Sequence, residues 1–114
     1  MPVSEEYIGF VKDQLRLVPV LSFRRMFGAI GIYSRGYFFA IINDDVLFFK
    51  VDDTNRKDYE AAGCAQFWPM SDKSPMSYFE VPVEVIEDET ELKRWADKAI
   101  AVSRTAAAKK KPTR

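Results

Sequence analysis

The chain has 114 residues, of which 47% are hydrophobic and 14% aromatic. It can therefore bury one core without help from a metal or disulfide, and its composition excludes a disordered protein. It has no histidine and one cysteine, which excludes an internal disulfide, a zinc site of the ordinary type and a histidine-assisted nucleophile.

The formal net charge is zero, but the charges are unevenly distributed. Five basic and no acidic residues follow Ser103, which leaves 12 basic against 17 acidic side chains before that point, a net charge of −5. Such a body repels phosphate on average. We expect any direct binding of nucleic acid to be weak and to come from Lys109, Lys110 and Lys111 in the tail.

The N-terminal residues lack the basic start and apolar stretch of a secretory signal. The longest apolar run, Tyr37 to Ile42, is too short to span a bilayer. Together with the lone cysteine, these features predict a cytoplasmic protein that has no contact with a membrane.

The first predicted element is a helix from Glu5 to Leu17. Ser4 is a suitable N-cap, two glutamates occupy the first turn, and Val3 and Ile8 have the spacing of a hydrophobic staple. Apolar residues then recur at helical spacing, and Pro19 should end the helix near Leu17.

Next come three β-rich runs, 24–33, 37–42 and 46–51, separated by the turns 34–36 and 43–45. Connections this short predict an antiparallel meander. The middle run is apolar at every position, so we expect a central strand that is covered on both faces or lies at a subunit contact. The glycines in this region are interpreted as bulge and turn residues: Gly28, Gly31 and Gly36.

A short helix is predicted within 52–62, with Gly63 just after its end. Two short strands at 67–69 and 77–81 should flank a polar loop. Asp88 and Glu91 have capping-box spacing before a last helix, whose apolar stripe fades after Ser103 into a tail expected to fray. We therefore predict an α+β domain over 1–103, an antiparallel sheet of four to five strands packed with an N-terminal and a C-terminal helix, followed by a basic tail, 104–114.

Six segments resemble the TfoX N-terminal domain family and occur in the same order as in that family: 24–28, 31–33, 49–52, 59–63, 76–82 and 92–96. The resemblance covers roughly Glu5 to Ser103. It implies an α+β domain that occurs either alone or joined to a C-terminal helical domain resembling DNA-binding domains. In regulators of natural competence the two-domain form acts with a transcription activator. The resemblance implies no catalytic residues.

The cysteine and the clustered carboxylates of this sequence have structural interpretations. Cys64 follows a predicted helix end without a basic neighbour, so we interpret it as a packed side chain rather than a reactive thiol. The carboxylates around the start of the last helix, Glu84, Glu87, Asp88, Glu89 and Glu91, are interpreted as a solvated helix start rather than a cation site or an acid–base pair. No metal or cofactor is predicted.

Arg24 and Arg25 form the sharpest feature of the sequence. Neighbours on a strand point to opposite faces, so at most one arginine faces the core. Anchoring to a carboxylate, for example Glu80, is favoured over anion binding. If an anion binds, Arg35 and Tyr33 are the natural helpers. Trp68 and Tyr78 could stack a ligand, although packing in a core or interface is the favoured interpretation.

The leading hypothesis is a non-enzymatic regulatory or protein-interaction module that forms a homodimer and contacts a protein of the transcription machinery. The alternative is a domain that binds a small ligand or anion through Arg25 and nearby aromatic side chains. Catalysis is not expected, because the sequence lacks side chains suited to proton transfer near pH 7.

Overall fold

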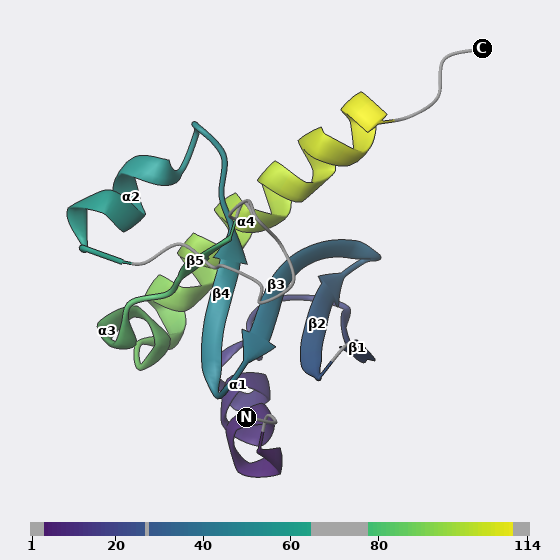
Figure 1. Ribbon diagram of the computed structural model, residues 1–114, viewed down its shortest axis with the longest axis vertical. Coiled ribbons are helices and arrows are strands. Elements are labelled where there is room, and N and C mark those ends of the chain that lie inside the picture. Colours follow the sequence, from purple (N-terminus) through teal and green to yellow (C-terminus); the bar gives the residue numbers. More distant parts are fainter. Residues whose placement is uncertain (1–3, 27, 65–77, 111–114) are drawn as a thin grey trace.

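The protein is an α+β domain in which one antiparallel sheet is packed against helices (Figure 1). The computed structural model describes residues 4–26, 28–64 and 78–110. The elements in chain order are α1 (Glu5–Gln14), β1 (Leu21–Met26), β2 (Ala29–Ser34), β3 (Tyr37–Asn43), β4 (Val46–Lys50), α2 (Arg56–Ala61), β5 (Tyr78–Glu80), α3 (Val83–Ile86) and α4 (Glu89–Lys110). The predicted fold class is confirmed.

The sheet is a meander with strand order β1-β2-β3-β4-β5, and each described strand pairs antiparallel with its sequence neighbour. Two of its turns contain pairs of residues with positive φ, Arg35 (+51°) with Gly36 (+85°) and Asp44 (+54°) with Asp45 (+57°). Such two-residue turns match the twist of the flanking strands. The predicted meander, its turns at 34–36 and 43–45 and the central place of β3 are confirmed.

The first predicted β run was wrong in one respect, because it forms two strands instead of one. Met26 pairs with Ala29, and Gly28 between them has a φ of +81°. Glycine adopts this conformation without the steric cost of a side chain, so the chain can reverse there. Gly28 and Gly36 are turn residues as predicted, whereas Gly31 lies within β2 opposite Arg24.

The bulge predicted for this region lies elsewhere. The register between β2 and β3 shifts between Ile32 and Tyr33, so that Ile32 faces Ala40 and Tyr33 faces Phe38. Phe39 is the extra residue on β3. It is fully buried in the main core, where its ring lies 5.6 Å from that of Phe49.

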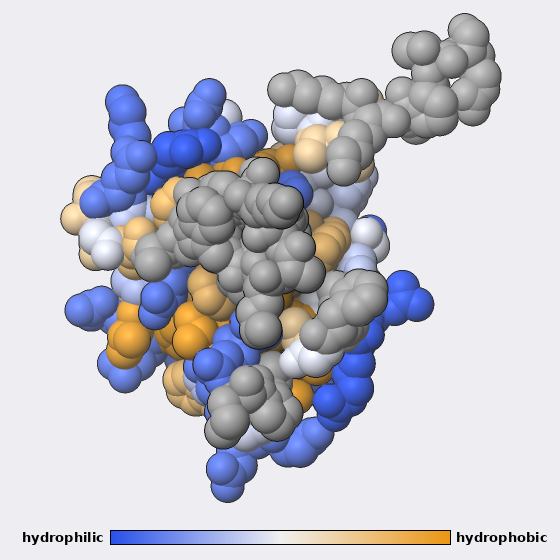
Figure 2. Space-filling view, viewed as in Figure 1, coloured by the Kyte–Doolittle hydropathy of each residue, from blue (hydrophilic) through white to orange (hydrophobic). Residues whose placement is uncertain are grey.

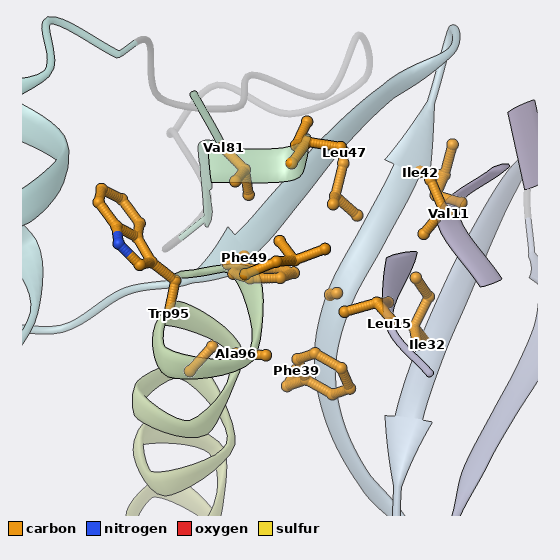
Figure 3. Packing of buried hydrophobic residues seen from close by; sticks show 14 of the residues in the cluster. Val11, Leu15, Ile32, Phe39, Ile42, Leu47, Phe49, Val81, Trp95 and Ala96 are labelled. Atoms are coloured by element: carbon orange, nitrogen blue, oxygen red, sulfur yellow. The ribbon is translucent and has the colours of Figure 1, made fainter. Parts of the chain in front are cut away.

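The main core lies between the sheet and the helices. Figure 3 shows Val11 of α1 and Leu15, which directly follows α1, beside Ile42 and Ile32 of the sheet, and Ala96 of α4 beside Phe39. All of these side chains have little or no exposed surface. We call this side of the sheet the helix face, and the opposite side the second face.

Both long helices begin where the sequence predicts, and both end elsewhere. Ser4 Oγ accepts a hydrogen bond from the Tyr7 N–H at 3.1 Å, and Asp88 Oδ1 accepts from the Glu91 N–H at 3.2 Å. However, α1 ends at Gln14 and not at Leu17, because the chain then tightens into turns in which the Val18 N–H donates to the Leu15 carbonyl. Leu15 and Val18 both become buried in this way.

The helix α4 continues to Lys110, so the expected fraying after Ser103 was wrong. Alanine is the strongest helix former, and Ala106 to Ala108 extend the helix beyond its apolar stripe. The short helix α3 was not predicted. The proposed staple with Val3, the strand at 67–69 and the polar loop lie outside the described residues.

Candidate functional site

The two arginines of the sharpest sequence feature lie on opposite faces of the sheet, as predicted. Arg25 points to the helix face, where its Nη2 lies 2.7 Å from Oε2 of Glu5 in α1. Arg24 lies on the second face, with its guanidinium carbon 6.0 Å from the centre of the Tyr33 ring. Anchoring to Glu80 was wrong, because β1 and β5 form opposite edges of the sheet.

A line of aromatic rings crosses the second face, with a cation at each end. The rings of Tyr33 and Phe38 stack with centroids 4.9 Å apart, and Phe38 lies 5.8 Å from Tyr78. Arg24 covers Tyr33 at one end, and Lys50 Nζ lies 5.1 Å from the centre of the Tyr78 ring at the other. Cations over aromatic faces are attracted by the ring quadrupole. We call these five residues the cation–aromatic row.

Apolar side chains of the second face pack together with the row. Ile41, Phe48 and Tyr78 are buried in a second, smaller cluster that is separate from the main core. Burial raises the pKa of the Tyr78 phenol above its ordinary value. Tyr33 and Phe38 keep part of their surface exposed, and Arg24 is exposed. The row therefore combines one buried ring, Tyr78, with side chains that keep exposed surface.

Only some of the predicted site residues meet in this row. Arg24, Tyr33 and Tyr78 do, whereas Arg25 is paired with Glu5 on the helix face. Arg35 occupies the turn between β2 and β3, in a groove beside α4. Trp68 lies outside the described residues. A ligand that contacts Arg25 therefore lies on the opposite side of the sheet from Tyr33 and Tyr78.

Phe38 and Lys50 belong to the row but were missed at the level of sequence. The two-residue turn between β2 and β3 pairs Phe38 directly with Tyr33, and directly paired residues lie on the same face of a sheet. Lys50 pairs directly with Tyr78, but that pairing joins two segments that are far apart in the chain. Only the pairing of Tyr33 with Phe38 has a local signal, which is the turn between the two strands.

Cys64 packs against the main core, and burial raises the pKa of its thiol. A nucleophilic cysteine needs the opposite shift. The geometry thus agrees with the interpretation of Cys64 as a packed side chain.

The acidic helix start is occupied by capping and pairing. Asp88 caps α4, Glu89 Oε1 lies 2.9 Å from Nη2 of Arg16, and Glu91 bonds to Arg94 at 2.7 Å. The hydrogen bond from Arg94 lowers the pKa of the Glu91 carboxyl. Within 4–26, 28–64 and 78–110, no group of three or more Cys, Asp or Glu side chains has the arrangement of a metal site. None of the helices in these ranges is long and apolar enough to cross a bilayer.

Comparison with known protein families gives one clear result. The TfoX N-terminal domain matches residues 13–103, which is most of the chain. No curated protein matches the chain significantly. The matched range contains the whole sheet and the first part of α4. The chain therefore belongs to the TfoX N-terminal domain family.

Proposed function

We propose that this chain is a non-enzymatic regulatory module that acts by binding another protein, in the manner of the N-terminal domain of competence regulators. The observation that carries the proposal is the family match over residues 13–103. The proposal places the chain in the cytoplasm, where a partner from the transcription machinery would be found.

The cation–aromatic row is the surface best suited to such a contact. Tyrosine, phenylalanine and arginine are enriched in protein interfaces. The aromatic rings provide a large contact area at a small cost in conformational entropy. Arg24, Tyr33 and Phe38 supply these side chains on a rigid sheet. On the side of the molecule shown in Figure 2, orange apolar areas lie among blue polar ones.

The titratable side chains support a non-enzymatic role. Burial raises the pKa of the Tyr59 and Tyr78 phenols and of the Cys64 thiol, which keeps these groups protonated. A catalytic acid or base works best when its pKa lies near the operating pH. None of these three shifts is in the direction that catalysis near neutral pH needs.

We further propose that the chain forms a homodimer. Large apolar side chains stand exposed at several places on the surface, including Phe10, Leu17, Val20 and Val83. Light scattering between 10 and 500 µM, a range chosen to bracket roughly micromolar affinity, tests this form. A rise in mass toward twice the monomer supports it, and a constant monomer mass throughout contradicts it.

The proposal is tested by affinity purification of the chain from its own organism, followed by mass spectrometry. We expect RNA polymerase or a transcription activator to be recovered in an amount proportional to the amount of the chain. Recovery of the chain alone, at expression levels close to the natural one, contradicts a protein-binding role. Arg25→Gln serves as a matched control, since Arg25 lies on the helix face and contacts α1.

A further inference from the structure

An open groove lies between the second half of α4 and the turn that joins β2 to β3. It measures about 510 Å³, and a neighbouring hollow of about 480 Å³ extends it along the helix past Arg104. Figure 1 shows the last turns of α4 extending beyond the sheet, so the helix forms a free wall there. Its lining includes Pro19, Ser34, Arg35, Tyr37, Ile100 and Arg104.

The groove carries positive charge that the protein does not neutralise. Arg35 and Arg104 both line it, and the described part of the chain supplies neither guanidinium with an ion-pair partner. Lys93 and Asp97 in the same wall neutralise each other across 2.6 Å. Two free arginines therefore remain in one groove of a body that is acidic overall.

The wall that presents Arg35 is held in place by two hydrogen bonds to the connection before β1. Ser34 Oγ donates to the Pro19 carbonyl at 2.7 Å, and the Arg35 N–H donates to the Val20 carbonyl at 3.0 Å. Val20 has a φ of +50°. A β-branched residue rarely adopts this conformation. The arginine thus projects from a fixed turn.

The groove also offers apolar surface. Tyr37 and Ile100 line it and are each partly exposed, and Pro19 lies at the same site. Sites for small molecules typically measure 300–1,000 Å³ and combine such surface with a few polar groups that fix orientation. Guanidinium groups bind carboxylate and phosphate through paired hydrogen bonds.

From these observations we propose that the groove binds a small organic oxyanion, a molecule with a carboxylate or phosphate group on a compact apolar body. Arg35 and Arg104 hold the oxyanion, and the Tyr37 ring with Ile100 contacts the body. This activity is independent of the proposed binding of a protein partner, because the groove and the cation–aromatic row share no residue.

The test is an NMR titration of the ¹⁵N-labelled full chain with phenyl phosphate, benzoate and inorganic phosphate. We expect saturable shifts of backbone amides at residues 34–37 and 97–105, with inorganic phosphate the weakest of the three. The stronger of the two aromatic probes identifies phosphate or carboxylate as the preferred group. Arg104→Gln and Arg35→Asn should each weaken binding about tenfold, the loss expected for one charge-assisted contact.

Asparagine tolerates the positive φ of position 35, and Arg25→Gln is the control for loss of one arginine elsewhere. The ¹⁵N spectrum of each variant shows directly whether it is folded. Shifts that never saturate, that spread over all basic surfaces, or that weaken equally with Arg25→Gln would overturn the proposal.

Discussion

The two faces of the sheet are built from the same strands but organised in opposite ways. On the helix face, aliphatic and aromatic side chains meet helices α1 and α4, and the residues at its centre have no exposed surface. On the second face, a small buried cluster supports aromatic rings flanked by Arg24 and Lys50. One face of the meander thus forms the main core of the fold, whereas the other presents the side chains on which the proposed protein contact depends.

Removal of an aromatic ring should lower the free energy of unfolding most on the helix face. Phe39 is fully buried on the helix face, at the bulge of β3. Phe39→Ala should lower the free energy of unfolding by about 3–5 kcal/mol, through lost burial and the cavity left behind. Urea denaturation followed by circular dichroism measures it, and a loss below about 1 kcal/mol would show that this face is not the main core.

A high-pH titration probes both faces at once through one buried phenol on each. Burial raises the pKa of Tyr59 in the main core and of Tyr78 in the second cluster above the ordinary 10.0. Below pH 10 both phenols are protonated in the folded and unfolded states. Above it they ionise only on unfolding, so stability falls by about 1.4 kcal/mol per group for each pH unit.

Urea unfolding between pH 9 and pH 11 measures this fall. Tyr59→Phe and Tyr78→Phe should each remove one group's share of the slope. If Tyr78→Phe leaves the slope unchanged, Tyr78 is accessible to water and the second cluster is not closed.

A smaller effect is expected for the exposed side of the cation–aromatic row. Tyr33 is partly exposed and stacks on Phe38 at 4.9 Å. Tyr33→Ala should cost about 1–2 kcal/mol of stability, from partial burial and one ring pair. The same urea experiment checks it, and a loss as large as that of Phe39→Ala would contradict the division between the two faces.

The smallest effect concerns the ion pair between Arg25 and Glu5. Both side chains are largely exposed, 72% and 79%, and exposed pairs contribute little because water screens them. Arg25→Gln should change stability by less than about 0.5 kcal/mol in the same denaturation experiment. A larger loss would assign Arg25 a structural role at the edge of the helix face.

Much of the helix face could be predicted from sequence, because its signals are local. The Ser4 and Asp88 caps, the turns after Ser34 and Asn43 and the apolar run of β3 each depend on residues within a few positions of one another. Alternation along β1 likewise separates Arg24 from Arg25. The first strand pair was missed because residues 27–28 carry only one turn-favouring residue, Gly28.

The second face and the groove could not be predicted in the same way. The bulge at Phe39 places this ring in the main core beside Ala40, and it has no local sequence signature. The row also depends on the pairing of Lys50 with Tyr78, and the groove on the packing of α4 beside the turn at Arg35. This pairing and this packing both bring together segments that are distant in the chain.

The most direct test of the central claim is partner capture by three forms of the chain at equal abundance: wild type, Tyr33→Ala and Arg25→Gln. We predict that wild type and Arg25→Gln recover the same partner protein in equal amount, and that Tyr33→Ala loses at least about nine tenths of it, the result of removing an aromatic anchor. Equal recovery by all three forms would contradict the claim that the second face of the sheet is the binding surface.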